Sequence, residues 1–184
     1  MWRSIRYVHY VHDCYTGRTS TTYLSQLSMI IETPKRIKHS YSQNLAGPPE
    51  IVFPLLCPVR ECDWTPGWNP VKVISKSGIA EKDCMFVTPA RPNDAVWIVT
   101  EHDPGAFHVQ MYKVTPGHTV AKLEITLSPA AGNTTRADVS YEYTAIAEAG
   151  EKFLREFTSD WYENFMKEWE DALNHYLTTG EMIS

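Results

Sequence analysis

The order of the local sequence patterns restricts the fold of this chain more than any single motif. After residue 35, short strand-like runs follow one another with only turns between them, and one long helical pattern closes the chain. Strands joined by short turns are typical of an antiparallel meander rather than a parallel sheet. Such a sheet has one face to cover, and a terminal helix can cover it while leaving room for a ligand. The runs are Arg36–Gln43, Val71–Ser75, Cys84–Thr88, Ala95–His102, Phe107–Thr115, Val120–Leu127 and Arg136–Ala145.

Two of these runs alternate cleanly between apolar and polar side chains. In Val120–Leu127, alanine, leucine and isoleucine alternate with lysine, glutamate and threonine. Arg136–Ala145 alternates in the same way, with Tyr141 and Tyr143 on its apolar face. A period of two is typical of a half-buried antiparallel strand. We therefore expect an α+β fold with an antiparallel sheet of about six to seven strands.

The clearest predicted element is one long helix from Glu148 to about Tyr176. Apolar residues recur at every fourth position and acidic residues occupy the opposite side, as in a helix that covers a core. Gly180 follows as a natural stop. The predicted apolar stripe consists of Phe153, Phe157, Trp161, Phe165, Trp169 and Leu173.

A rigid, aromatic segment, Pro48–Trp68, lies between the first strand and the rest of the sheet. Two prolines at its start can open a helix, and Pro54 and Pro58 keep that helix short. Thr65–Trp68 has Pro-Gly at the centre of a turn. The segment therefore predicts short helices after the first strand, placed to close one end of the sheet.

Composition excludes several classes of function. The formal charge of −5 disfavours nucleic acid as a partner, and no run of 18 apolar residues exists to span a membrane. The N-terminus lacks a continuous apolar signal segment, which favours a cytoplasmic location with reduced cysteines. The four cysteines form no close pair, and no phosphate loop, dinucleotide fingerprint or HExxH motif occurs. We expect neither a metal nor a cofactor.

The N-terminal residues differ from the rest of the chain in composition. Residues 1–35 show no sustained period over most of their length, and we expect them to form an extension outside the core fold. Met29 is a plausible start for a shorter protein, and the spacing of His9 and His12 would put both on one helix face. The expected domain covers residues 36–178, followed by a tail at 179–184.

One set of residues resembles a known superfamily. The stretch Phe53–Trp68 (FPLLCPVRECDWTPGW), Ser77–Glu81 (SGIAE) and the strand Val96–His102 are similar to the START-like, or SRPBCC, superfamily, in particular to a bacterial branch of unassigned proteins. The resemblance covers about residues 36–177. It implies a helix-grip fold, in which a curved antiparallel sheet wraps around a long C-terminal helix and encloses an apolar cavity. That fold hosts carriers, cyclases, hormone receptors and chaperone cofactors, so the resemblance implies no single reaction.

Two residues are candidates for acid–base chemistry. Glu61 lies between aromatic residues, and a carboxyl buried there would have a raised pKa suited to proton transfer. Alternatively, Arg60 pairs with a nearby carboxylate and the aromatic residues simply fill the end of the sheet. His102 flanks a turn close to Glu101 and can act as a base if a carboxylate orients it. The sequence therefore assigns no catalytic residue and offers only His102 and Glu61 as candidates.

Large amphipathic side chains are the candidate ligand-binding residues. Tyrosine and tryptophan combine an apolar body with one polar tip, which suits a ligand pocket as well as an ordinary core. Tyr141 and Tyr143 share one strand face and are the strongest of these candidates. The complete set is Trp64, Trp68, Trp97, Tyr112, Tyr141, Tyr143 and Trp161.

Three functions are compatible with the sequence. The first is binding of a small hydrophobic or aromatic molecule, lipid- or polyketide-like, between the sheet and the C-terminal helix. The second is an enzyme of the polyketide cyclase or dehydratase type that uses acid–base residues in the same cavity. The third is an interaction protein similar to the chaperone cofactors that share the fold. The sequence indicates no oligomeric state.

Overall fold

The computed structural model describes residues 29–183, and the chain divides into two units between Thr33 and Pro34. In the first unit only residues 29–33 are described; they are exposed and form no helix or strand. The helix face predicted for His9 and His12 lies outside the described residues. All the described helices and strands belong to the second unit.

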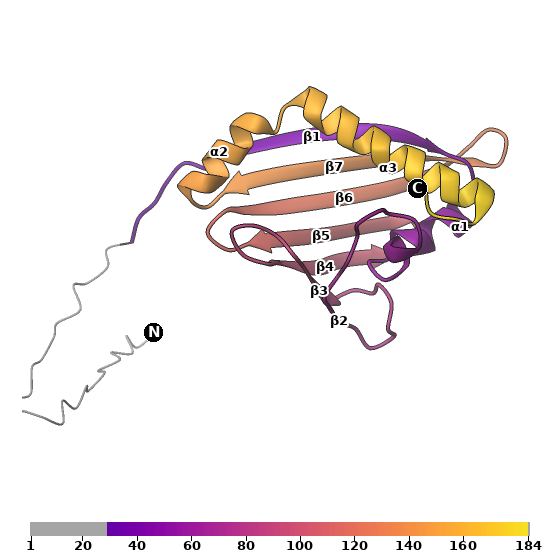
Figure 1. Cartoon of the computed structure of the whole chain (residues 1–184), viewed down its shortest axis with the longest axis horizontal. Helices are drawn as coiled ribbons and strands as arrows, with labels where there is room; N and C mark the ends of the chain where they lie inside the picture. Colours follow the sequence, from indigo (N-terminus) through magenta and orange to yellow (C-terminus); the bar gives the residue numbers. More distant parts are fainter. Residues whose placement is uncertain (1–28, 184) are drawn as a thin grey trace, which may run out of the picture. The chain divides into compact units, whose positions relative to one another are not determined.

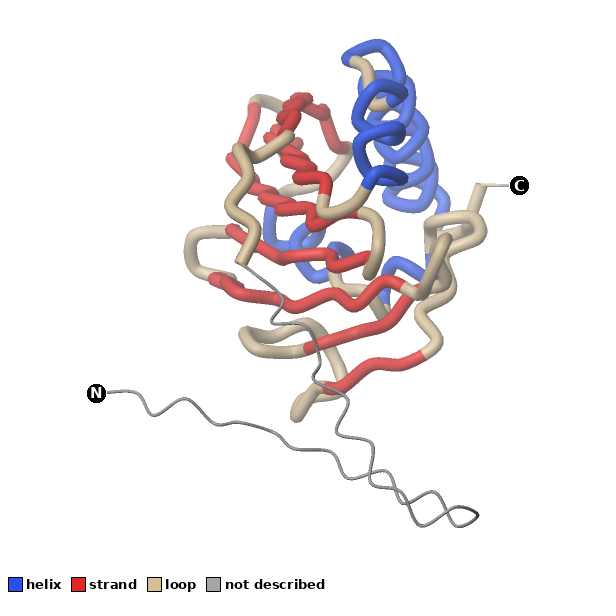
Figure 2. The backbone as a smooth tube through the Cα atoms, turned by 90° about the vertical axis from the view of Figure 1, so that its left-hand side faces the viewer, coloured by secondary structure: helices blue, strands red, loops and turns tan. Residues whose placement is uncertain are grey.

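The described residues form a seven-stranded antiparallel sheet in which sequence neighbours lie side by side, except at one edge. The spatial order is β1-β7-β6-β5-β4-β3-β2, so the first strand pairs with the last. Figures 1 and 2 show the curved sheet with the C-terminal helices on one side of it. The strands are β1 (Arg36–Leu45), β2 (Lys72–Ile74), β3 (Met85–Thr88), β4 (Ala95–Asp103), β5 (His108–Thr115), β6 (Thr119–Ala130) and β7 (Thr134–Ala145).

Short helices follow β1, as the sequence predicted. They are α1 (Pro49–Val52) and the 3-10 helices η1 (Phe53–Leu56) and η2 (Arg60–Asp63). Phe53, Leu55 and Leu56 are buried, and the segment joins the hydrophobic core that the sheet forms with the C-terminal helix. Pro54 and Pro58 limit the lengths of α1 and η1, because proline cannot donate the hydrogen bond that a helix interior requires.

The predicted single C-terminal helix is wrong in one respect, because it is divided into α2 (Glu148–Glu156) and α3 (Ser159–Thr179). Thr158 begins α3 as its N-cap, and its hydroxyl accepts a hydrogen bond from the backbone N–H of Trp161. Phe157, at φ −79° and ψ 69°, leaves the helical conformation, yet its side chain is buried. A capping threonine thus restarts the helix in a new direction. In Figure 1, α3 follows β1 and β7.

The face that α3 buries also differs from the predicted stripe. Tyr162, Met166 and Leu173 are fully buried, whereas Trp161 and Phe165 are 48% and 37% exposed. A helix turns by about 100° per residue, so positions four apart drift by about 40° each time and a stripe with that spacing winds around the helix. Tyr162 was missed for this reason, although its hydroxyl donates to the backbone oxygen of Val139 in the core.

Polar contacts fasten α3 to β1. The buried Gln43 side chain donates to the backbone oxygen of Met166 over 2.8 Å. Asn174 accepts from the backbone N–H of Ala46 and donates to the backbone oxygen of Asn44. These bonds satisfy backbone groups at the sheet edge and hold α3 above the sheet, which determines where space remains between them.

Candidate functional site

An apolar chamber of about 180 Å³ lies between the sheet and α3. Three parts of the chain form its wall: the inner face of the sheet, α3, and the segment containing η2 and the turn that follows it. Its polar side chains are few, namely Glu61, Thr65 and the hydroxyl of Tyr141. The remaining lining residues are Trp68, Phe86, Trp97, Met111, Leu123, Ile125, Val139, Phe165, Met166 and Trp169.

A wider vestibule of about 510 Å³ adjoins the chamber. Trp68, Trp97, Tyr141 and Phe165 line both spaces and therefore form an aromatic neck between them. The vestibule continues between the sheet and α2. Its other lining residues are Pro89, Ala90, Arg91, Lys113, Thr115, His118, Thr119, Tyr143, Phe153 and Trp161.

The register of the sheet determines which side chains enter these spaces. Phe86, Trp97, Lys113, Ala121 and Tyr143 stand in one cross-strand row. Because alternate residues of a strand point to the same face, every member of this row faces α2 and α3. Alanine is the smallest member of the row, and it leaves space between the lysine and the tyrosine.

Glu61 is the acidic residue of the chamber. Its backbone N–H donates to the oxygen of Cys57 over 2.8 Å, which holds η2 against the preceding turn. Arg60 pairs with Asp63 at 2.6 Å, so among the described residues no salt bridge neutralises Glu61. Although the residue keeps some accessible surface, its carboxyl group lies among protein atoms, and this burial raises the pKa of Glu61 to about 8.

Two neighbouring polar groups accompany Glu61. The hydroxyl of Thr65 is buried without a hydrogen-bond partner among the described residues. Burial is also the main reason that the pKa of Tyr141 is raised, and the nearby carboxyl of Glu61 contributes. A protonated Glu61 and these two hydroxyls can donate to an acceptor on a ligand, or exchange a proton with it.

Lys113 is the corresponding cation of the vestibule. Its ammonium lies 5.1 Å from the centre of the Trp97 ring, a cation–π arrangement. Burial lowers the pKa of Lys113, and no carboxylate contributes to the shift. The inward orientation of Lys113 could have been predicted from the sequence of β5, because Lys113 is two and four residues from the inward-facing Met111 and Val109.

Most of the predicted site residues are brought together. Glu61, Trp68, Trp97 and Tyr141 line the inner chamber, and Tyr143 and Trp161 line the vestibule. Sequence reasoning missed Thr65 and Met111 as lining residues, because a small hydroxyl and an ordinary apolar residue carry no distinguishing pattern.

Three predicted residues lie elsewhere. Trp64 is fully buried and donates to the backbone oxygen of Leu55, so it fills the core behind the chamber wall. Tyr112 pairs across the sheet with Lys122 on the outer face, because it lies one residue out of phase with Met111 and Lys113. His102 packs against Phe53 with ring centres 5.1 Å apart and lines neither space.

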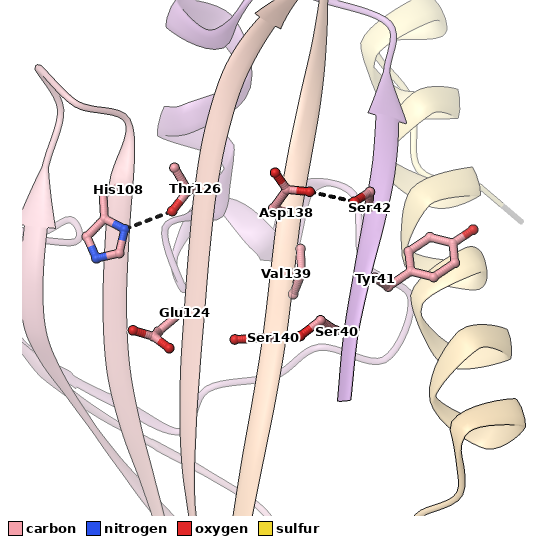
Figure 3. Close-up of a pocket in the computed structure, with 9 residues that line it drawn as sticks. All are labelled: Ser40, Tyr41, Ser42, His108, Glu124, Thr126, Asp138, Val139 and Ser140. Atoms are coloured by element: carbon pink, nitrogen blue, oxygen red, sulfur yellow. Dashed lines mark hydrogen bonds between the residues drawn. The ribbon is translucent and has the colours of Figure 1, made fainter. Parts of the chain in front are cut away.

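A separate polar hollow of about 390 Å³ lies on the outer face of the sheet (Figure 3). His108 contacts Thr126 at 3.0 Å, and Ser42 donates to Asp138, both drawn in Figure 3. Glu124 accepts from Lys122 at 2.9 Å. These polar groups therefore already have partners within the sheet, whereas the carboxyl of Glu61 and the hydroxyls of Thr65 and Tyr141 have none among residues 29–183.

No family model matches the chain, and no curated protein matches it. Solved structures do. Norcoclaurine synthase from Thalictrum flavum superposes with a TM-score of 0.59 at 12% identity, covering 84% of this chain and 99% of that one. The Mll3558 protein from Rhizobium loti gives 0.55 at 12% identity, covering 78% and 99%. Ara h 8.0201 gives 0.52 at 11% identity, covering 77% and 97%.

This chain has the helix-grip fold. The helix-grip fold predicted from the sequence is therefore confirmed. At such low identities the likeness establishes the fold alone. A solved complex of the Thalictrum enzyme contains dopamine and hydroxybenzaldehyde, which is a property of that protein. The function of this helix-grip protein depends on the chemistry of its own chamber and vestibule.

Proposed function

We propose that this protein binds a small hydrophobic or aromatic molecule, lipid- or polyketide-like, between its sheet and α3. The observation that carries the proposal is the apolar chamber with its aromatic neck and adjoining vestibule. Ligand pockets typically occupy about 300–1,000 Å³, are mostly apolar and contain a few placed polar groups. The vestibule of about 510 Å³ falls in that range, and the chamber extends it into the core.

The shape of the core supports this function over a purely structural role for the fold. Protein interiors are close-packed, and aromatic side chains that border an empty space lose favourable van der Waals contacts. An interaction protein that works through its surface has no need of such a space. A ligand that contacts Trp97, Tyr141 and Phe165 would recover that energy. The Thalictrum enzyme, which has a similar fold, has been solved in complex with two aromatic molecules.

A second candidate function is an enzyme of the cyclase or dehydratase type. Glu61 favours it, because a carboxyl group with a pKa of about 8 is protonated at neutral pH and close to the pKa that proton transfer requires. It would donate a proton to a bound carbonyl or hydroxyl and take one back as the product forms. Glu61→Gln would then abolish turnover while binding persists, whereas a pure carrier would show no turnover in either protein.

The proposed binding is tested by native mass spectrometry of protein purified gently from its own host. We expect an added small-molecule mass that is released on denaturation. The variant Leu123→Trp fills the chamber from β6 and should lose that mass. Thr126→Trp is the matched control, because it adds a similar bulk to the same strand on the exposed outer face. Equal occupancy in both variants would place the ligand outside the chamber and contradict the proposal.

The cytoplasmic location and the division into an extension at 1–35, a domain at 36–178 and a tail remain predictions from the sequence. Limited proteolysis checks the division, because cleavage is expected before residue 36 and not within the sheet.

A further inference from the structure

Basic side chains line the vestibule. Arg91, Lys113 and His118 line it, and none of its described lining residues is acidic. The chain as a whole carries a formal charge of −5, so an all-basic lining is not a consequence of general composition. A concave site lined by one sign of charge concentrates ions of the other sign.

Lys113 is the member of this group that most needs a partner. It stands in the cross-strand row between Trp97 and Ala121, where burial lowers its pKa. The ring of Trp97 offers its face but no negative charge. A buried ammonium without a carboxylate is costly, and an anion that enters the vestibule removes that cost by forming a charge-assisted hydrogen bond.

The inner chamber has the opposite preference. Glu61 lines the chamber and not the vestibule, whereas Lys113 lines the vestibule and not the chamber. An anion placed beside Glu61 would lose its hydration among apolar side chains and would disfavour ionisation of the carboxyl. A neutral apolar or aromatic group fits there instead. The two spaces therefore differ in the polarity of the ligand group that each accepts.

We propose that the ligand is an amphipathic carboxylate whose apolar or aromatic body passes through the neck into the chamber and whose anionic end binds Lys113 in the vestibule. This inference rests on the proposed binding function and adds to it the chemical class and the orientation of the ligand. Arg91 supplies a further positive group at the same end, and the phenol of Tyr143 can donate a hydrogen bond.

A matched pair of probes tests the inference. Naphthalene-2-carboxylate and naphthalene-2-carboxamide have nearly the same shape and differ in charge. Titration calorimetry at pH 7 should show the carboxylate binding at least about tenfold more tightly than the amide, the range of one charge-assisted hydrogen bond. In Lys113→Met this preference should disappear while the affinity for the amide stays unchanged, and Lys113→Arg should retain much of the preference.

Lys122→Met is the control, because Lys122 belongs to the neighbouring strand but points to the outer face and pairs with Glu124. It should leave both affinities unchanged. Equal binding of the two probes, or a preference that survives Lys113→Met, would overturn the inference while leaving the binding function intact. Suppose that mass spectrometry has already shown a ligand that is lost in Leu123→Trp. If wild-type protein then binds neither naphthalene probe, the inference is also overturned.

The binding function has its own test. It fails if the Leu123→Trp and Thr126→Trp variants carry the same amount of ligand.

Discussion

At the scale of single residues, position decides between core and cavity for side chains of the same type. Trp64 and Trp68 are four residues apart in one aromatic segment, yet the first is fully buried and the second lines both the chamber and the vestibule. Each indole donates to a backbone oxygen of the same segment, Trp64 to Leu55 and Trp68 to Pro58. Their different roles follow from the turn that begins after η2.

Trp64→Ala should therefore destabilise the protein by about 3–5 kcal/mol, the usual cost of removing a buried tryptophan. Trp68→Ala should cost less stability and weaken ligand binding more, since its ring is half-buried and faces the chamber. Urea unfolding and probe titration on both variants measure the two effects. A loss below about 1 kcal/mol for Trp64→Ala would contradict its place in the core.

The raised pKa of Glu61 also has a consequence for stability. The folded protein keeps this carboxyl protonated up to a pKa of about 8, whereas in the unfolded chain it ionises near its ordinary value of 4.5. Folding therefore takes up a proton between these values, and the free energy of unfolding should fall as pH rises from about 4.5 to about 8. Above that range the loss is complete, and below it there is none.

Glu61→Gln removes this titration and should be more stable than wild type by about 5 kcal/mol at pH 9 but not at pH 4.5, since the pKa differs by about 3.5 units between the folded and unfolded chain. Urea unfolding at the two pH values measures the difference. Glu50→Gln serves as the control for the substitution itself, because Glu50 is exposed on α1. A constant difference for Glu61→Gln would mean that its carboxyl is solvated.

At the scale of elements, the boundary between α2 and α3 shapes the site. Phe153 on α2 and Trp161 on α3 both line the vestibule, and the residues between them change the direction of the chain. A single straight helix would carry the aromatic stripe around its axis and away from the sheet. Ending α2 at Glu156 and restarting at Ser159 returns aromatic side chains to the site.

Thr158→Ala should cost about 1 kcal/mol of stability, because it removes the cap that accepts from the backbone N–H of Trp161. Thr158→Ser keeps the hydroxyl and should be close to wild type. Thermal unfolding followed by circular dichroism compares the two variants. Equal destabilisation by both would show that the threonine methyl group, and not the cap, stabilises the junction.

At the scale of the whole molecule, three parts of the chain that are distant in sequence enclose one space. The inner face of the sheet, α3 and the segment with η2 each contribute lining residues. Among the described residues, no helix is long and apolar enough to cross a membrane. Polar bonds hold α3 along the β1 edge of the sheet, and the chamber lies between α3 and the inner face of the sheet.

Much of the fold was predictable because it depends on local signals. Turn residues and a period of two located the strands, and helical spacing located the C-terminal helix. The interruption at Thr158 was missed because a strong apolar pattern continues across it. The predicted stripe included the half-exposed Trp161 and left out the buried Tyr162, because spacing in sequence does not say which side of a helix meets the sheet.

The sequence alone indicated the character of the site, an aromatic set with one embedded acid, and six of the residues that line the two spaces. Only the tertiary structure decided that Tyr112 faces outward, that His102 packs against Phe53 and that Lys113 faces inward without a carboxylate. These outcomes depend on strand register and on contacts between distant segments. Burial and pairing, which set both the pKa of Glu61 and the need of Lys113 for an anion, exist only once those segments have packed together.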